Sequence, residues 1–176
     1  MGWAVGKFGK IAATRDGGET WEAQKSGTDN ALRDIFFINQ NRGWAVGDLG
    51  TLISTLDGGQ SWTAQQSGTK KHLRNISFTD ELTGWVVGEQ GTVLHTVNSG
   101  TEWEERDDLH SFFTLADNPF LISLFGSCFI NGETGWIAGD YGTIIHTRHG
   151  GETWEHQKSC TTALLMDITF LTSLKG

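Results

Sequence analysis

Residues 43–62 read GWAVGDLGTLISTLDGGQSW, and this stretch recurs three more times along the 176-residue chain. The other copies span residues 2–21, 84–103 and 135–154, so successive copies start 41, 41 and 51 residues apart. A repeat of this length is one supersecondary unit that cannot bury its apolar face alone and therefore stacks against its neighbours. The sequence thus predicts one repeat domain over residues 1–176.

Each copy, with the residues around it, carries the pattern of four short strands. In the second unit, residues 32–38 are rich in β-branched and aromatic side chains, which favour a strand. Residues 44–46, 51–55 and 61–65 predict three further strands, separated by glycine-containing turns. Four antiparallel strands per unit of about 40 residues indicate the blade of a propeller. The expected fold class is all-β: a β-propeller built from four repeats of four antiparallel strands.

The last segment, residues 165–171, has the pattern of a first strand whose companions do not follow. Three arrangements remain open at this point. The segment completes the N-terminal blade and closes a four-bladed ring, which hides the sheet edges. Alternatively the chain is one part of a longer propeller, or a second copy completes the ring in a homo-oligomer.

The third interval is longer than the others because of an insertion at about residues 107–123. It contains three phenylalanines, Phe112, Phe113 and Phe120, together with other apolar side chains. Longer surface loops cost little free energy and often carry function. The insertion either forms a docking patch with exposed turn tips or folds its apolar side chains back onto the ring.

Residues 14–21 and 55–62 fit the Asp-box pattern Ser/Thr-x-Asp-x-Gly-x-Thr/Ser-Trp. The carboxylate is expected to accept backbone N–H groups of the turn that follows it, and the tryptophan to pack between sheets. The third copy has Asn in place of the acid, which keeps an acceptor, and the fourth has His, which supplies a poorer one. We interpret these positions as structural: Asp16, Trp21, Asp57, Trp62, Asn98, Trp103, His149 and Trp154.

Composition excludes several classes of function. With 21 acidic and 13 basic side chains the formal net charge is −8, which argues against a nucleic-acid partner or an anionic membrane surface. No apolar run approaches the roughly 20 residues that cross a bilayer, so direct membrane insertion is not expected. Cys128 and Cys160 have no metal-site spacing, and no metal or other cofactor is predicted. Met1 leads directly into a repeat without a basic-then-apolar leader, so no signal peptide is predicted and the compartment stays unknown.

The combination of GWAVG, GTLI and DGG-x-Ser/Thr-Trp closely resembles the Asp-box (BNR-like) propellers of the photosystem II stability and assembly factor family. The resemblance covers essentially the whole chain outside the insertion. It implies a non-catalytic assembly scaffold that binds a protein partner, whose identity is unknown, in the periplasm or the thylakoid lumen. The family is seven-bladed, and its partner-binding surface is rich in arginine.

Arg33 and Arg74 occupy the same position at the start of the inner strand, where the later copies have Phe125 and Met166. A propeller places both arginines at one mouth of its central channel. Each either binds a partner or lays its stem over the apolar rim. The tips of the Gly-x-x-Gly turns are expected to be exposed on the same face as the insertion. The predicted partner-binding residues are Arg33, Arg74, Phe112, Phe113, Phe120 and Tyr141.

Sialidases also carry Asp boxes and are the enzymatic alternative. Their chemistry needs three converging arginines, a tyrosine nucleophile paired with an acid, and an acid/base aspartate. The single tyrosine, Tyr141, falls on an expected turn tip, and only two arginines share the inner position. The sequence therefore predicts no enzyme and no catalytic residues, with a sialidase-like or glycan-binding Asp-box propeller fragment as the alternative.

Overall fold

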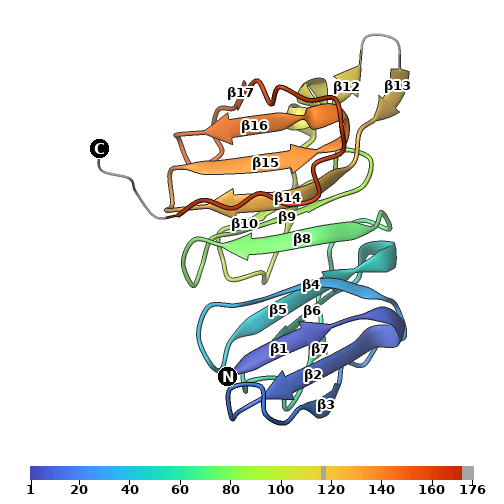
Figure 1. Cartoon of the computed structure of the whole chain (residues 1–176), viewed down its shortest axis with the longest axis vertical. Helices are drawn as coiled ribbons and strands as arrows, with labels where there is room; N and C mark the ends of the chain where they lie inside the picture. Colours follow the sequence, from blue (N-terminus) through green and yellow to red (C-terminus); the bar gives the residue numbers. More distant parts are fainter. Residues whose placement is uncertain (116–117, 172–176) are drawn as a thin grey trace.

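Within each sheet of this protein the strands pair with their neighbours along the chain, because a turn reverses the backbone between them. The computed structural model describes residues 1–115 and 118–171. It shows an all-β fold in which four antiparallel sheets stand side by side in a propeller-like arrangement (Figure 1). The predicted fold class is confirmed.

The first sheet has three strands, β1 (Gly2–Val5), β2 (Lys10–Thr14) and β3 (Glu22–Lys25). The second sheet has four, in the order β4 (Leu32–Phe37), β5 (Gly43–Gly47), β6 (Leu52–Thr55) and β7 (Thr63–Ala64). The third sheet repeats this order with β8 (Leu73–Phe78), β9 (Gly84–Gly88), β10 (Val93–Thr96) and β11 (Glu104–Glu105). The fourth contains β14 (Leu124–Phe129), β15 (Gly135–Gly139), β16 (Ile144–Thr147) and β17 (Glu155–His156).

Short 3-10 turns and the insertion make up the remaining elements. The Gly-x-x-Gly turns form η1 (Lys7–Gly9), η2 (Asp48–Gly50) and η4 (Asp140–Gly142). The insertion forms η3 (Asp107–Phe112) and the hairpin of β12 (Thr114–Leu115) and β13 (Asn118–Leu121). Among the residues described, no helix combines the length and the hydropathy that crossing a bilayer requires.

Residues 165–171 differ from the sequence-based expectation. They form no regular strand and run along the fourth sheet, far from β1, which lies at the other end of the stack (Figure 1). The amide of Leu165 donates to the carbonyl of Gly139, at 3.1 Å. In this structure the segment therefore does not complete the N-terminal blade, because its hydrogen bond and its packing hold it to the sheet that precedes it in the chain.

Tryptophan and phenylalanine rings form the contacts between neighbouring sheets. The tryptophan of each second strand stacks on the phenylalanine that ends the next inner strand. Ring centroids are 3.5 Å apart for Trp3 and Phe37 and 3.8 Å for Trp44 and Phe78. The Asp-box tryptophan then meets the same phenylalanine edge-on, as Trp103 meets Phe78 at 5.9 Å. The prediction that tryptophans pack between sheets is confirmed for these residues.

Trp21 is the exception to this packing. It is 49% exposed, whereas Trp154 at the same position of the fourth unit is 9% exposed. Trp154 lies against Phe129 of β14, but the first sheet has no inner strand to supply such a ring. Although Trp21 belongs to an Asp box, the expectation that it packs between sheets is wrong in this structure.

The Asp-box turns have the predicted hydrogen bonds. Asp57 accepts the backbone N–H of Ser61 at 2.9 Å and its hydroxyl at 2.6 Å. Asn98 in the third unit accepts the N–H of Glu102 at 3.0 Å, and the ring Nδ1 of His149 in the fourth lies 2.7 Å from the Thr153 hydroxyl.

Sequence reasoning missed the buried threonine that opens each of these turns. The hydroxyl of Thr55 accepts the N–H of Gly59 at 2.9 Å. The same bond recurs in the other three units, with donors and acceptors Gly18 to Thr14, Gly100 to Thr96 and Gly151 to Thr147. Because this bond survives in all four units, it fixes the turn even where the acid is replaced.

Candidate partner-binding face

The tips of the Gly-x-x-Gly turns carry non-glycine residues in the left-handed backbone region. The φ angles are 59° at Phe8, 56° at Leu49, 55° at Gln90 and 55° at Tyr141. This conformation costs roughly 1–2 kcal/mol for an L-residue with a Cβ. Three of the tips are nevertheless large and apolar, and they are exposed by 75% at Phe8, 60% at Leu49 and 56% at Tyr141. The predicted exposure of the tips is confirmed. Backbone strain of this kind is concentrated at functional sites, which makes the tips candidates for a binding role.

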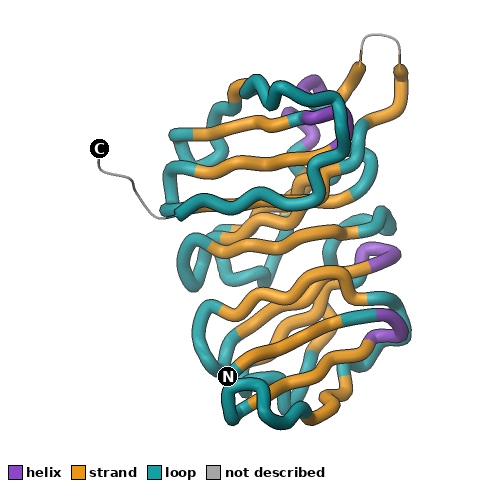
Figure 2. The backbone as a smooth tube through the Cα atoms, viewed as in Figure 1, coloured by secondary structure: helices purple, strands orange, loops and turns teal. Residues whose placement is uncertain are grey.

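These tips and the insertion share one side of the molecule. Figure 2 shows the short helical turns along the same edge as the insertion hairpin. Two backbone hydrogen bonds join them: Gly91 donates to Ile122 at 2.7 Å, and Asp140 donates to Ser123 at 2.9 Å. The face predicted from the repeat phase therefore exists as a continuous edge.

Each inner strand carries a β-bulge at the predicted arginine position. The register between inner and second strand shifts between Leu32 and Asp34, and again between Leu73 and Asn75. Arg33 and Arg74 are therefore the extra residues of their bulges. A bulge bends its strand and redirects the extra side chain, which here reaches the turn of its own sheet.

Both arginines are paired with an acid in that turn. Arg33 binds Asp48 through two hydrogen bonds, Nε to Oδ1 at 2.7 Å and Nη2 to Oδ2 at 2.6 Å. Arg74 pairs with Glu89, and its guanidinium carbon lies 5.8 Å from the ring centroid of Phe125. The sequence analysis offered two roles for each arginine, partner binding or packing over the rim. The structure adds a third that the sequence analysis missed: each arginine forms an ion pair within its own sheet.

Hydrogen bonding between Arg33 and Asp48 sets their protonation. It lowers the pKa of the Asp48 carboxyl below its ordinary value and raises the pKa of Arg33. His72 Nδ1 lies 3.1 Å from Asp48 Oδ1 and accepts the N–H of Leu49 at 3.3 Å. A guanidinium has five N–H donors. Asp48 takes two of them, and no other acceptor in the described part of the chain takes the remaining three.

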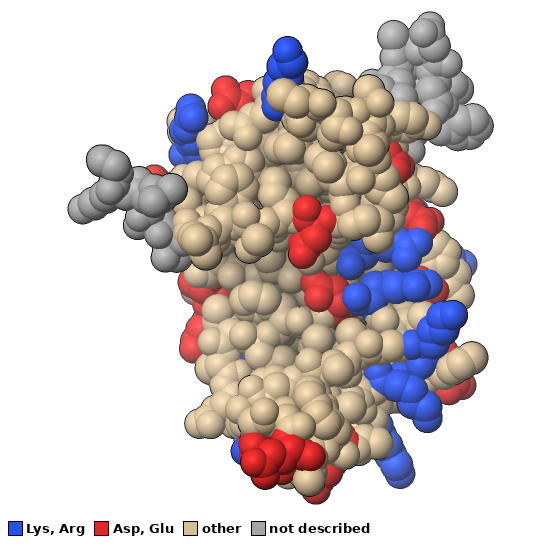
Figure 3. All heavy atoms as spheres, viewed as in Figure 1, with Lys and Arg blue, Asp and Glu red and all other residues tan. Residues whose placement is uncertain are grey.

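A shallow hollow of about 370 Å³ lies between the tips of the first two sheets. It combines apolar tips with cationic groups, and Lys and Arg gather along the right-hand side of the molecule in the same view (Figure 3). This local arrangement contrasts with the net charge of −8 for the whole chain. We call it the tip hollow; its lining residues are Lys7, Phe8, Asp29, Asn30, Ala31, Arg33, Asp48, Leu49 and His72.

The insertion contributes less to this face than predicted. Phe113 is wholly buried in a cluster with Trp85 and Trp154, so its prediction as a surface contact is wrong. Phe112 is partly buried against the same cluster, and its ring centroid lies 5.2 Å from that of His156. Both side chains fold back onto the sheets because burial removes their rings from water. The side chain of Phe120 lies outside the described residues.

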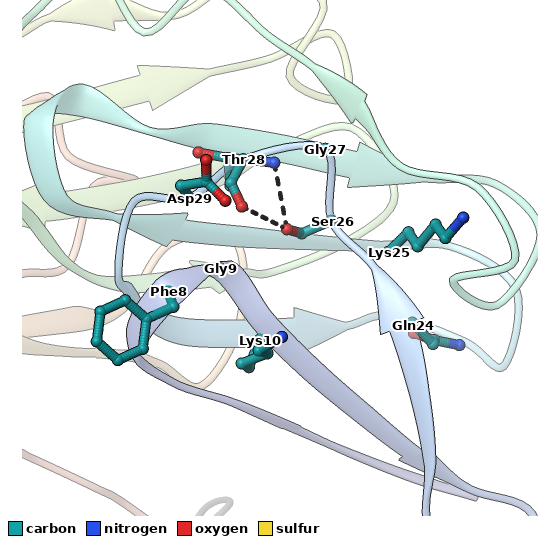
Figure 4. A pocket seen from close by; sticks show the side chains of 9 residues that line it. All are labelled: Phe8, Gly9, Lys10, Gln24, Lys25, Ser26, Gly27, Thr28 and Asp29. Atoms are coloured by element: carbon teal, nitrogen blue, oxygen red, sulfur yellow. Dashed lines mark hydrogen bonds between the residues drawn. The ribbon is translucent and has the colours of Figure 1, made fainter.

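A second hollow, of about 350 Å³, adjoins the turn between β3 and β4 (Figure 4). Ser26 Oγ donates to the carbonyl of Thr28 at 3.1 Å and lies 3.3 Å from the Thr28 nitrogen. The corresponding Ser67–Thr69 and Ser159–Thr161 turns have the same contact from serine Oγ to threonine carbonyl, at 3.2 and 3.0 Å. Because this Ser-x-Thr turn recurs, we assign it to the scaffold.

Polar side chains link the inner strands of neighbouring sheets. Asn75 donates to Asp34 at 2.7 Å, and Ser127 donates its N–H and its hydroxyl to Asn75 at 2.9 and 2.6 Å. Burial raises the pKa of Asp34 above its ordinary value. Asn75 also opens a formal glycosylation sequon, and its bonds to Asp34 and Ser127 explain its place inside a strand.

One acidic cluster was not anticipated. Ligand-type atoms of Glu105, Asp107 and His110 lie within 4.8 Å of one another. Lys71 Nζ is 2.8 Å from Glu105 Oε1, so part of the negative charge is already balanced within the chain.

Comparisons with solved structures show the fold. YCF48 bound to D1 peptide matches with 17% identity and a TM-score of 0.53, over 88% of this chain and 76% of that one. YCF48 from Cyanidioschyzon merolae matches with 23% identity and a TM-score of 0.56, over 75% of this chain and 41% of that one. A GH74 enzyme from Niastella koreensis matches with 16% identity and a TM-score of 0.62, over 90% of this chain and 29% of the enzyme.

An ancestral GH74 enzyme has the same 16% identity and a TM-score of 0.64; the match covers 87% of this chain and 23% of the enzyme. The chain thus spans less than half the length of three of these four structures. A comparison with curated proteins finds no match. The sequence profile of the family described as photosynthesis system II assembly factor YCF48 matches residues 21–73 and 62–164. Since these two ranges cover most of the 176 residues, the chain belongs to the YCF48 photosystem II assembly factor family.

Proposed function

We propose that this chain is a non-catalytic binding protein that holds an exposed segment of a protein partner in the tip hollow. The observation that carries the proposal is the pair of strained, exposed tips, Phe8 and Leu49, which line the same hollow as Arg33. Large apolar residues gain nothing for folding at such positions, because they pay for left-handed backbone and stay in water. Contact with a partner gives them a use.

The chemistry of the tip hollow defines the partner segment. Two apolar tips favour an apolar side chain, and the unused N–H groups of Arg33 favour a carboxylate or a backbone carbonyl. A family member has been solved with a bound D1 peptide, which supports a peptide segment as the partner of this chain as well. The proposed contacts are Phe8, Arg33 and Leu49, with Tyr141 and Arg74 farther along the same face.

Binding of a fluorescently labelled D1 peptide, measured by anisotropy, tests this proposal. Leu49→Asn removes an apolar tip while placing a residue that tolerates left-handed φ. We expect this variant to be at least as stable as the wild type, with a Kd raised about tenfold or more, as for a contact worth about 1.4 kcal/mol. Leu56→Asn is the matched control, because Leu56 is also exposed but lies in an Asp-box turn at the other end of β6. An unchanged Kd for Leu49→Asn, or the same loss for both variants, would refute the assignment.

To test the role of Arg33 in binding, both members of its ion pair with Asp48 must be replaced by neutral residues. Reversing the charge of Arg33 and Arg74 to Glu would set two carboxylates against Asp48 and Glu89 and could unfold the bulges. Arg33→Gln together with Asp48→Asn removes both charges at once. We expect this double variant to keep its melting temperature and to lose peptide affinity, and full retention of affinity counts against a role for Arg33.

The structural similarity to GH74 enzymes supports testing a second candidate function, which is glycan binding or glycan hydrolysis. The observation in its favour is the fold match, at TM-scores of 0.64 and 0.62. Tyr141 lies on an exposed turn. A sialidase would instead need its tyrosine nucleophile in the central channel. Hydrolysis of a fluorogenic sialoside would overturn the non-catalytic proposal, and saturable binding on a glycan array at high salt would favour a lectin.

A further inference from the structure

His72 connects two neighbouring sheets at the tip hollow. It lies immediately before β8 of the third sheet, and its carbonyl accepts the N–H of Glu89 in the turn of that sheet, at 2.9 Å. Its ring contacts the preceding sheet, where Nδ1 lies 3.3 Å from the backbone nitrogen of Leu49 and 3.1 Å from Asp48 Oδ1. One ring nitrogen therefore faces both a donor and an acceptor in η2.

A proton on Nδ1 decides which of these two contacts is a hydrogen bond. Without a proton, Nδ1 has a lone pair that accepts the N–H of Leu49. With a proton, Nδ1 donates to Asp48 Oδ1, and the N–H of Leu49 loses its acceptor. Because both bonds use the same nitrogen, they cannot form at the same time, and the ring has two states.

The other apolar tip of the hollow, Phe8, provides an internal comparison. The residue that precedes the inner strand of the second sheet is Ala31, whose carbonyl accepts the N–H of Asp48 at 2.9 Å. Its methyl side chain lines the same hollow as Phe8 but offers no acceptor. Both tips have left-handed backbone, with φ of 59° at Phe8 and 56° at Leu49. The chain thus contains one tip beside an imidazole and a similar tip beside a methyl group.

The surroundings of the ring allow its proton to change. The His72 side chain is 36% exposed, so water reaches it. Hydrogen bonding to Arg33 is the main cause of the low pKa of Asp48, and the charge of Arg74 acts in the same direction. The carboxylate therefore stays ionised as an acceptor in weak acid. The charged side chains that line the hollow or act on this carboxylate are Lys7, Asp29, Arg33, Asp48 and Arg74, the last paired with Glu89.

We propose that His72 is a positioning residue for the Leu49 tip, which it holds only while Nδ1 carries no proton. Histidine is the side chain that ordinarily changes its charge between roughly pH 5 and pH 8. In acid the bond passes from Leu49 to Asp48, and the tip keeps its backbone strain without the bond that helps to offset it. The consequence for partner binding rests on the proposed function of the tip hollow, whereas the exchange of hydrogen bonds does not.

Solution NMR of the full chain tests the exchange of hydrogen bonds without any partner. Between about pH 8 and pH 5 the amide proton of Leu49 should shift upfield, along the same titration curve as the His72 ring. His72→Asn is the matched variant, because its amide oxygen is bonded to Cγ as Nδ1 is and accepts at every pH. The Leu49 shift should be flat in this variant, and Phe8 should show no step of comparable size in either protein.

Two NMR results would overturn the proposal. One is a Leu49 amide shift in the wild type that does not follow the titration of the His72 ring. The other is an equal step in His72→Asn, which would assign the shift to another titrating group.

Anisotropy with a labelled D1 peptide tests whether this contact matters for binding. From about pH 8 to pH 5 the ratio of the wild-type Kd to that of His72→Asn should rise about threefold or more, as for the loss of one net hydrogen bond. The ratio removes the titration of the peptide itself. His72→Phe keeps a ring without an acceptor and should bind at pH 8 as weakly as the wild type does at pH 5.

A constant ratio of the two Kd values over this range would refute the role of His72 in binding. If the wild type and both variants fail to bind the peptide even at pH 8, the proposed function of the tip hollow is refuted instead. The NMR titration still decides whether His72 holds the tip, since it needs no partner.

Discussion

Gly50 shows how one residue position can fix a turn. It has φ of 70°, and a Cβ there would lie 2.0 Å from the carbonyl oxygen of Thr69. Gly9 and Gly142 have equally close contacts at the same position of their units, at 1.8 and 2.0 Å. The second glycine of these three Gly-x-x-Gly turns is therefore required by close packing of the Ser-x-Thr turn as well as by its backbone angle.

A pair of glycine substitutions separates these two causes. Gly68 has φ of 76° with nothing within 4 Å of an added Cβ, so Gly68→Ala should cost only the roughly 1–2 kcal/mol of left-handed backbone. Gly50→Ala adds a clash with backbone and should cost more than about 4 kcal/mol. Urea denaturation checks both values. Equal losses would show that the close contact relaxes without cost.

The Asp box works at the scale of an element, since it ties the end of one strand to the start of the next. The hydroxyl of Ser61 contributes most to holding the pKa of Asp57 down at about 2, followed by the Ser61 N–H and the Thr55 hydroxyl. The folded state thus favours the ionised carboxylate more than the unfolded chain does, where the pKa is near 3.8. Stability from this group is present above pH 4 and is lost as the pH falls towards 2.

This linkage predicts a pH-dependent effect of Asp57→Asn. The variant should melt below the wild type at pH 6, and the two melting temperatures should converge as the pH approaches 2. Asn98 occupies the same position in the third unit, so the amide fits the turn. Thermal melts followed by circular dichroism from pH 6 to pH 2 provide the measurement. A constant difference over this range would mean that Asp57 acts through packing and not through its charge.

At the scale of the whole molecule, stability depends on contacts between neighbouring sheets. Across the described residues the interior contains three apolar clusters along the stack, and each joins the strands of adjacent sheets. Such an array resembles a one-dimensional chain in which each unit is stabilised by its neighbours. Phe78 is central to one interface, because it stacks on Trp44 at 3.8 Å and meets Trp103 edge-on at 5.9 Å.

Removing this ring should weaken the middle of the stack. Phe78→Ala deletes a buried aromatic side chain and should lower the free energy of unfolding by about 3–5 kcal/mol. The control Leu56→Ala changes an exposed side chain and should stay within about 0.5 kcal/mol of the wild type. Chemical denaturation measures both. A loss below about 1 kcal/mol for Phe78→Ala would show that the interface repacks.

The candidate site could be predicted only in part from the sequence. Repeat spacing and the Gly-x-x-Gly pattern were enough to expect exposed tips at Phe8, Leu49 and Tyr141, because a hairpin turn must lie at the end of its strands. Pairing of Arg33 with Asp48 was not visible, since a bulge brings together residues 15 positions apart. The burial of Phe113 also depends on how the insertion packs, which its composition does not specify.

The sequence by itself determined the all-β repeat architecture and the place of Trp3, Trp44 and Trp85 between sheets, because regular spacing repeats the same local geometry. Only the tertiary structure decided which of the Asp-box tryptophans are covered by a neighbouring aromatic ring. Trp21 and Trp154 have the same local motif, yet one is half-exposed and the other buried. The burial of a tryptophan depends on whether another strand or sheet packs against it, and the local sequence of the motif does not specify this.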